Sequence, residues 1–410
     1  MESNTSITKY NFYDYFIIAI LASTVAGTAQ IGFISHTFLA GILCLPFALK
    51  EVIHSFKKGN ISPIILLMLV WILYASASFL WAPRQGNFFK DLWGLVWNIV
   101  IFIGLYHSAH QANLTEQSIL SGLRILIAFT LMIAFWEITT DSHIAGFGDY
   151  NEDANIDIDG RVERRIFAAV TYKNLNSYVT LLCMALPFLM YGLFVLQKKW
   201  FSLLVLLGAV VVLIVNSSRG GLMCLAVDFV VFALLYRKQN LPNKGLITFF
   251  VSIAIILIIV KYGLVIAEQA IGRLASYGTK NMMSDEGRWN VWALGLQLCG
   301  ESLGFGWGVG SMQAMYESTG FWLHYSHNLI IEFLMQYGIW LFMFIGIMFF
   351  KNWTFLIKKG NNSQKLLGWL LLVSFVPLAI IDDSYLPHTY AWIWFAMQFA
   401  IVRNIKEQTT

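Results

Sequence analysis

The chain has 410 residues, of which 58% are apolar, 16% aromatic and only 12% charged, and its formal net charge is +4. This composition excludes an ordinary soluble domain, because such domains are about one quarter charged. It is typical of a protein whose solvent is mostly lipid, and the small positive charge gives no reason to expect nucleic acid as a partner.

Windows of about 20 apolar residues, long enough for a helix to cross a hydrocarbon core, recur along nearly the whole chain. We therefore predict an all-α polytopic membrane protein with about twelve transmembrane helices, formed as a single integral membrane domain over residues 1–410. The expected spans are 13–29, 31–49, 62–81, 91–108, 118–137, 176–195, 201–217, 220–236, 245–266, 326–350, 364–382 and 387–402. In three places two consecutive expected spans are separated by only a few residues: within 13–49, 201–236 and 364–402. Each of these pairs could also contain a re-entrant turn.

An even number of spans places both termini on one side of the membrane. Most of the 27 Lys and Arg residues fall on that side, mainly in short loops. Because cytoplasmic loops carry an excess of Lys and Arg, we expect cytoplasmic termini in a multi-pass protein of the bacterial inner membrane.

Two segments on the outer, periplasmic side are too long to be simple connections: residues 138–175 and residues 267–325. In the second, Trp289 and Trp292 recur at helical spacing, which predicts a short helix lying along the membrane surface. The glycine-rich run 304–312 follows, and it is expected to form a flexible or closely packed turn, since neither a preceding strand nor a GK[ST] supports a nucleotide loop. We expect 267–325 to bear part of an active site.

The first outer segment resembles the start of a calcium loop at Asn155, Asp157 and Asp159. However, Ile166 stands where a bidentate Glu would be needed. A solvated loop is the preferred interpretation, divalent-ion binding is the alternative, and we expect no metal site and no cofactor.

An enzyme on the outer face has no access to cytosolic nucleotide sugars, so its glycan donor must arrive activated on a lipid such as a polyprenyl diphosphate. That chemistry needs cations to hold the diphosphate and a base to accept a proton. The candidate cations are Arg219 in NSSRGGL and Arg288 before the Trp-bearing stretch; a snorkelling span flank and a solvated surface residue are the alternatives. The candidate base is His327 in LHYSHNLIIEF, near His324 and Asn328, with a hydrogen-bonded packing residue as the alternative.

These motifs together resemble the O-antigen ligase and O-antigen polymerase superfamily of membrane glycosyltransferases. The resemblance covers residues 160–385 and rests on SSRGG, GRWNVW, GFGWG and SHNLIIEFLMQYG, and YKNLNSY with Asn176 resembles the start of the sixth span in that family. It implies that Arg219 and Arg288 bind an undecaprenyl-diphosphate-linked glycan and take part in catalysis, and that His327 is the base. Asn328, Asn176, His324 and Asp382 or Asp383 are then expected to bind substrate, without a metal.

The resemblance implies an O-antigen ligase that transfers the glycan from undecaprenyl diphosphate to a lipid A core sugar. One base and no evident enzymic nucleophile predict inversion at the anomeric carbon. A polymerase that uses a lipid-linked repeat unit as acceptor is the alternative within the same chemistry, and transfer to a protein is a third choice. A lipid-linked oligosaccharide transporter is the alternative from another class, and the intramembrane Arg124, Asp228 and Lys261 are interpreted as structural charges or, on that alternative, as a translocation pathway.

Overall fold

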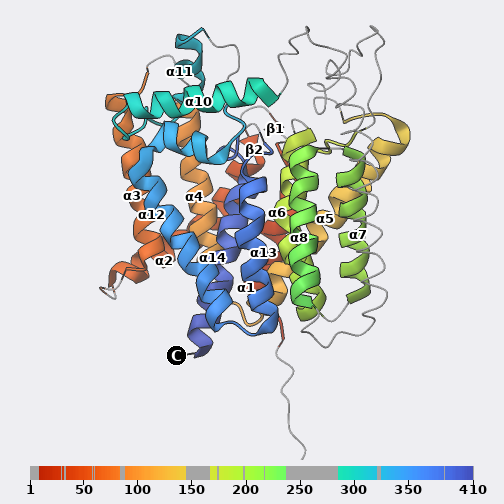
Figure 1. Cartoon of the computed structure of the whole chain (residues 1–410). Helices are drawn as coiled ribbons and strands as arrows, with labels where there is room; N and C mark the ends of the chain where they lie inside the picture. The colour runs from red at the N-terminus through yellow and green to blue at the C-terminus, as the bar shows by residue number, and fades with distance from the viewer. Residues whose placement is uncertain are drawn as a thin grey trace, which may run out of the picture.

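A computed structural model describes residues 9–409 except 29, 32–33, 58, 60, 84–87, 145–166, 173–174, 197–198, 217, 237–284, 321–324 and 383. The described residues form an α-helical bundle (Figure 1). Its helices are α1 (Phe12–Ser23), α2 (His36–Lys57), α3 (Pro63–Ala77), α4 (Phe88–Gln111), α5 (Thr115–Thr140), α6 (Leu175–Val195), α7 (Lys199–Asn216), α8 (Arg219–Tyr236), α10 (Asp285–Glu301), α11 (Met312–Ser318), α12 (Leu329–Lys359), α13 (Asn362–Leu378) and α14 (Thr389–Thr409). Short 3₁₀ turns η1 (Thr24–Ala26) and η2 (Ser78–Leu80) follow α1 and α3, and the strands β1 (Gln30–Ile31) and β2 (Ile34–Ser35) form a small antiparallel ribbon before α2.

Seven of the described helices are long and apolar enough to cross a membrane. They are α2, α3 with η2, α4, α5, α6, α7 and α12, while α1 with η1 and α8 are shorter apolar helices. The other expected spans near the C-terminus coincide with α13 and α14, and the span expected at 245–266 lies outside the described residues. The all-helical fold is therefore confirmed, and the total of twelve spans stays a prediction.

The helix α6 is the central element of the bundle. In its most apolar window 89% of the residues are buried, more than in any other described candidate span. It packs against α5, α7, α8, α13 and α14, whereas large apolar side chains such as Leu43, Leu73 and Leu204 point outward from the surrounding helices. This outward apolar surface is what a lipid solvent requires.

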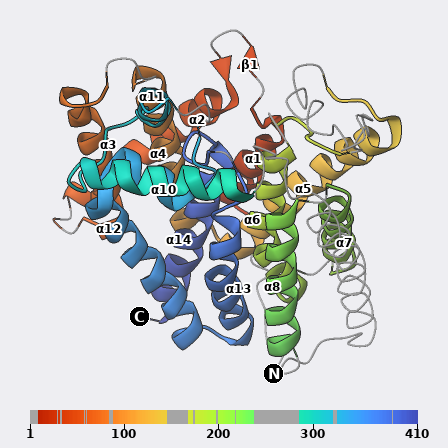
Figure 2. The same cartoon turned by 45° about the horizontal axis from the view of Figure 1, so that its top comes forward.

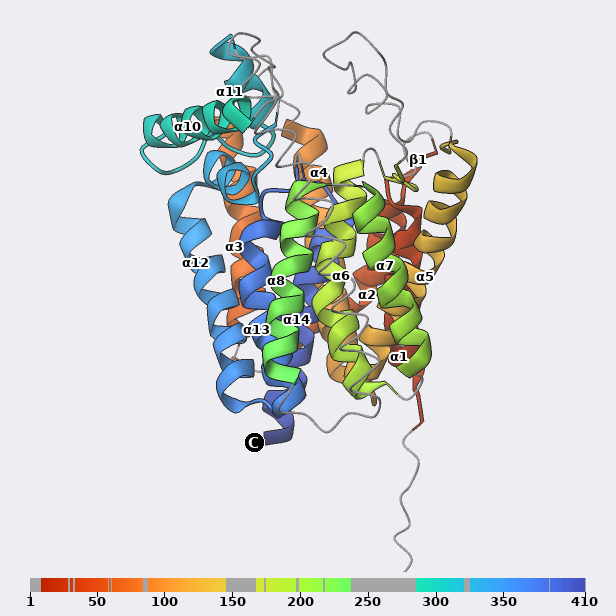
Figure 3. The same cartoon turned by 45° about the vertical axis from the view of Figure 1, so that its right-hand side comes forward.

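The two ends of the bundle differ in architecture. Helices α10 and α11 lie across one end, whereas the C-terminus and the start of α1 lie at the other, as Figures 1 and 3 both show. The end covered by α10 is called the α10 end, and the opposite one the terminal end. When the top of the molecule is turned toward the viewer, α10 crosses in front of the start of α12, against which it packs (Figure 2). The helix expected at the Trp-bearing stretch is confirmed as α10.

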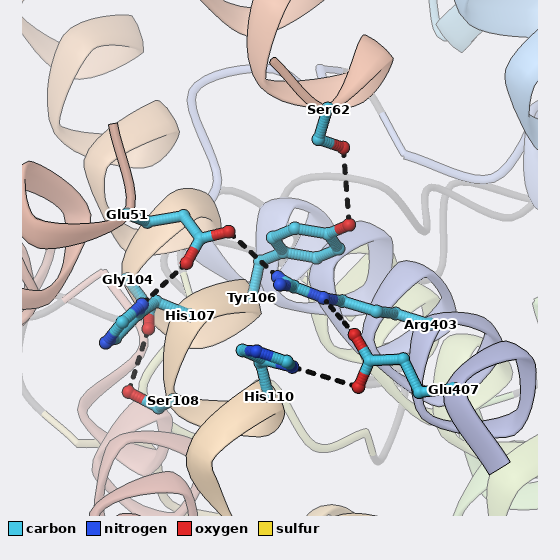
Figure 4. Close-up of polar contacts among 9 residues, drawn as sticks. All are labelled: Glu51, Ser62, Gly104, Tyr106, His107, Ser108, His110, Arg403 and Glu407. Atoms are coloured by element: carbon cyan, nitrogen blue, oxygen red, sulfur yellow. Dashed lines mark hydrogen bonds and ion pairs between the residues drawn. The ribbon is translucent and has the colours of Figure 1, made fainter. Parts of the chain in front are cut away.

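At the terminal end a buried polar cluster joins three helices (Figure 4). Glu51 of α2 accepts from His107 of α4 at 2.6 Å and from Arg403 of α14 at 2.9 Å. Arg403 also binds Glu407 at 3.0 Å and lies over the ring of Tyr106, 4.5 Å from its centroid. Glu51 is 3% exposed, so these partners compensate a carboxylate that has lost its water.

Two of the charged residues inside the expected spans, Asp228 and Arg124, have local partners. Asp228 of α8 is fully buried and accepts a hydrogen bond from Ser374 of α13. Arg124 of α5 donates to Ser202 at 3.2 Å and lies 4.9 Å from the ring centroid of Phe201. Lys261, the third of these intramembrane charges, lies outside the described residues.

Candidate functional site

The positions named by the sequence motifs gather at the α10 end. Gly220 directly follows Arg219, and a side-chain carbon at Gly220 would lie 2.9 Å from Ile381, so α8 begins against the segment that leads to Asp382. The backbone N–H of Leu329, two residues after His327, donates to Ala379 at the end of α13 at 2.8 Å. The starts of α8 and α12 therefore meet the same end of α13, although they are far apart in sequence.

Arg288 belongs to the first turn of α10, one helical turn before Trp292. The indole of Trp292 donates to the carbonyl of Ser326 at 2.8 Å, next to His327. This bond holds the first half of α10 beside the turn that precedes α12. The side chains of Arg219 and Arg288 lie outside the described part of the structure, as do His324 and Asp383, so convergence of the two guanidinium groups stays a prediction.

His327 occupies a constrained turn. Its φ is 50°, in the left-handed region that few residues with a side chain adopt, and the residue is half-buried. The residue before it, Ser326, donates from its hydroxyl to the carbonyl of Asn328 at 2.9 Å. The side-chain oxygen of Asn328 accepts from the N–H groups of Ile330 and Ile331 at 2.9 and 3.3 Å. Asn328 is thus the N-cap of α12, a structural role that the sequence analysis did not assign.

Asp382 is fully buried at the end of α13 and joins three elements. Its carboxylate accepts from Ser177 of α6 at 3.0 Å and from the hydroxyl of Tyr390 on α14. The imidazole of His388 lies 4.0 Å from the same carboxylate, measured from Nε2 to Oδ2. Asn176, the neighbour of Ser177, is half-buried at the start of α6. Two of the expected substrate-binding positions therefore lie in one polar region.

Glu332 is a further buried carboxylate, one turn into α12, and no role was expected for it. It accepts from the hydroxyl of Ser384 at 2.7 Å and from the backbone N–H groups of Tyr385 and Leu386 at 2.7 and 3.3 Å. Burial raises the pKa of the Tyr385 phenol well above its ordinary value, and the negative charge of Asp382 raises it further. Tyr385 is therefore a neutral hydroxyl, and it accepts from the N–H groups of Ile381 and Asp382, both at 2.9 Å.

The glycine-rich run forms a closely packed turn, one of the two forms expected for it. Helix α12 is broken at Gly338, where φ is 75° and ψ is 177°. The turn supplies the hydrogen bonds that the break removes: Trp307 N–H donates to Met335 at 2.7 Å and Gly308 N–H to Gln336 at 3.0 Å. In return Ile339 N–H donates to the carbonyl of Gly304 at 2.8 Å. A break in an expected span is thus compensated by protein backbone.

A cavity of about 550 Å³ lies beneath α11 at the α10 end. Its described walls come from η1 and the start of α2, the start of α4, the first part of α12 and the loop into α14. They include His36, Trp97, Gln336, His388 and Tyr390. This volume lies within the range of roughly 300–1,000 Å³ typical of small-molecule sites.

Two buried nitrogens in the cavity walls have no hydrogen-bond partner among the described residues: Nδ1 of His36 and Nε1 of Trp97. The other ring nitrogen of His36 contacts the hydroxyl of Ser23 at 3.0 Å. A buried polar group usually finds a partner, so such atoms point to a ligand or to solvent in the cavity. Neither residue was predicted from the sequence, because both come from the first five spans, where no motif marks them.

Part of this chain matches a known protein family. Residues 203–346 match the O-antigen ligase family model. The matched segment contains Arg219, Arg288 and His327, the three positions expected to carry the chemistry. The match is consistent with the O-antigen ligase superfamily and supports a multi-pass membrane glycosyltransferase of the O-antigen ligase or polymerase type. No curated protein matches the chain.

The described residues contain no group of three or more His, Cys, Asp or Glu side chains arranged to hold a metal ion.

Among the free cysteines, Cys299 on α10 is half-buried, and burial raises the pKa of its thiol. Burial also raises the pKa of the Tyr316 phenol on α11. These groups are neutral at physiological pH, so they offer no anionic site beneath α10.

Proposed function

We propose that this protein is an O-antigen ligase, which moves a glycan from undecaprenyl diphosphate to a sugar of the lipid A core on the periplasmic face of the inner membrane. The observation that supports the proposal is that the family match contains Arg219, Arg288 and His327, and that the backbone segments next to these positions lie at the same end of the bundle. The cavity beneath α11 lies at the same end. The start of α1 and the end of α14 lie at the opposite end, which is taken as cytoplasmic.

In the proposed reaction the acceptor hydroxyl oxygen attacks the anomeric carbon of the donor glycan. The bond from that carbon to the diphosphate oxygen breaks as the new glycosidic bond forms, and undecaprenyl diphosphate leaves. Arg219 and Arg288 compensate the negative charge of the leaving group, and a planar guanidinium suits this because it donates two parallel hydrogen bonds to phosphate oxygens. His327 accepts the proton of the acceptor hydroxyl. A single displacement inverts the anomeric configuration and needs no metal.

A polymerase that extends the glycan with a lipid-linked repeat unit uses the same donor chemistry and is the second candidate. The decisive experiment supplies purified protein with a preformed lipid-linked donor and with lipid A core or lipid-linked repeats as competing acceptors. Product on lipid A core supports the ligase, and growth of the lipid-linked chain supports the polymerase. Transfer to neither acceptor, with movement of donor across a vesicle membrane, would support a transporter and reject both enzymes.

A transfer assay in EDTA tests the metal-free mechanism, since an essential divalent ion would be removed. Comparison of the anomeric linkages of donor and product by NMR tests inversion. Retention of configuration would require a covalent enzyme intermediate and would reject the single displacement.

A further inference from the structure

We propose that the cavity beneath α11 is the binding site of the acceptor saccharide, and that His36 and His388 are the residues that position its hydroxyl groups. This inference rests on the proposed function and adds the location of the second substrate. The walls of the cavity suit a neutral sugar in three respects: their low net charge, their aromatic rings and their unpartnered buried nitrogens.

The described walls carry little net charge. Apart from histidines, their charged residues are Lys90 and Asp91, which are adjacent at the start of α4 and opposite in sign. A diphosphate needs an excess of cations, whereas a neutral glycan needs hydrogen-bond donors and acceptors. The cavity therefore suits the sugar of an acceptor better than the charged group of the donor.

Aromatic rings provide the apolar part of the walls. Trp93 and Trp97 lie edge to face with centroids 5.3 Å apart, and Phe38 is likewise edge to face with Trp97 at 5.2 Å. Tyr325, just before the His327 turn, lies in the wall near α11. A flat aromatic face packs well against the C–H face of a pyranose, while Trp and Tyr can also donate a hydrogen bond from the ring edge.

The two histidines come from helices that begin side by side. The hydroxyl groups of Thr37 on α2 and Thr389 on α14 are 2.5 Å apart, so His36 and His388, their direct neighbours, belong to adjoining parts of one wall. His36 is only 9% exposed and its buried Nδ1 has no partner among the described residues. His388 has the carboxylate of Asp382 4.0 Å away, and Asp382 also holds Tyr390 of the same wall. A neutral imidazole can donate to one sugar hydroxyl or accept from it.

The cavity also lies in the right place relative to the donor. Arg219 begins α8 next to Ile381, and Asp382 links that point to His388 and Tyr390 in the cavity wall. The position expected to hold the diphosphate and the cavity wall therefore both adjoin the segment that carries Asp382. A donor bound by the arginines and a sugar bound in the cavity would meet there, close to the turn that holds His327.

The first test measures the KM of each substrate for His36→Ala and His388→Ala. Loss of a hydrogen bond to the sugar should raise the acceptor KM roughly tenfold, while the donor KM stays within about twofold. His54→Gln is the matched control, because His54 is exposed near the other end of α2 and should leave both values unchanged. A rise in the donor KM instead, or variants that behave like the control, would overturn the inference. If the wild-type protein transfers glycan to no acceptor, the proposed function itself fails.

The second test does not depend on activity or on the histidines. Gln313 of α11 lines the cavity, so Gln313→Cys in a Cys299→Ser background places a thiol there for maleimide labelling. Free core oligosaccharide should slow labelling at this position by at least about fivefold, and it should not slow labelling of Gln297→Cys on α10. The two glutamines are matched, because each donates to a Glu four residues later on its own helix. Equal labelling with and without the oligosaccharide would contradict an acceptor site in this cavity.

Discussion

His327 combines a backbone constraint with an expected chemical role, and the two have separable consequences. At φ 50° a side chain crowds the backbone, and His, Asn and Asp tolerate this region better than most residues. Glycine adopts it without strain. A substitution can therefore remove the imidazole without disturbing the start of α12.

We predict that His327→Gly and His327→Asn keep the thermal stability of the wild-type protein but lose glycan transfer. Removal of a general base typically lowers a rate by about 10²- to 10⁴-fold. Donor binding should persist, because the diphosphate is held by other residues. The measurement is single-turnover transfer alongside the melting temperature of each variant. Transfer near the wild-type rate in His327→Asn would remove the residue from the mechanism.

Arg219 provides a second prediction for single residues. If its guanidinium holds the diphosphate through paired hydrogen bonds, Lys cannot replace it, because an ammonium group is a point charge without that planar geometry. Arg219→Lys should then be nearly as harmful as Arg219→Ala, with a loss of about 1.5 to 3 kcal/mol in donor binding. Donor titration of the purified variants measures this. Full activity of Arg219→Ala at a subsaturating donor concentration would contradict the assignment.

At the scale of elements, the helices could be predicted from sequence because apolar windows of the right length must become helices in lipid. The break in α12 could not, since Gly338 lies within an apolar window that reads as continuous. The hydrogen bonds that make the break possible come from Gly304 and Trp307, on a turn that precedes α12 and whose contact with Gly338 no local pattern reveals. The sequence thus predicts the turn, but it does not predict that the turn packs against the break in α12.

Gly338→Ala should therefore destabilise the protein strongly. A side-chain carbon there would lie 2.2 Å from the carbonyl oxygen of Gly304, and φ of 75° with ψ of 177° is a combination that only glycine adopts readily. Strained backbone of this kind costs about 1–3 kcal/mol before the clash is counted. Gly346→Ala is the control in the same helix, because nothing lies within 4 Å of the added carbon. It should be neutral or stabilise by up to about 1 kcal/mol.

Thermal unfolding followed by intrinsic tryptophan fluorescence distinguishes the two glycine variants. A lowered melting temperature for Gly338→Ala with an unchanged or raised one for Gly346→Ala is the expected pattern. Equal melting temperatures would mean that the glycine turn does not hold the break in α12.

At the scale of the whole molecule, the parts of the candidate site that the sequence predicts are those that one motif contains. The runs around His327 and Arg219 can be recognised because the residues of each motif are close in sequence. The adjacency of His36 and His388 cannot, because it depends on contact between Thr37 and Thr389, which are 352 positions apart. Which helix starts adjoin one another is decided by the packing of the complete bundle.

The same packing separates two polar regions by the length of the bundle, one at the α10 end and one at the terminal end. The terminal cluster of Glu51, His107 and Arg403 joins α2, α4 and α14, which are also helices that frame the cavity at the other end. Loss of one of these terminal interactions should therefore lower the stability of the bundle. It should leave the distant cavity unchanged in the folded protein.

Arg403→Ala tests this separation. It leaves the carboxylate of Glu51, which is 3% exposed, with its hydrogen bond to His107 but without the guanidinium, and removal of one member of a buried ion pair costs about 3–5 kcal/mol. The side chain of Arg403 is 19% exposed, so water screens part of the interaction and the lower end of that range is expected. The melting temperature should fall, whereas the KM values for donor and acceptor, measured well below it, should match those of the wild type.

Lys359→Ala, at an exposed position near the end of α12, is the control and should change neither the melting temperature nor the KM values. A changed acceptor KM in folded Arg403→Ala would show that the two ends are coupled through α2 and α14, and that the terminal cluster controls the cavity as well as the stability of the bundle.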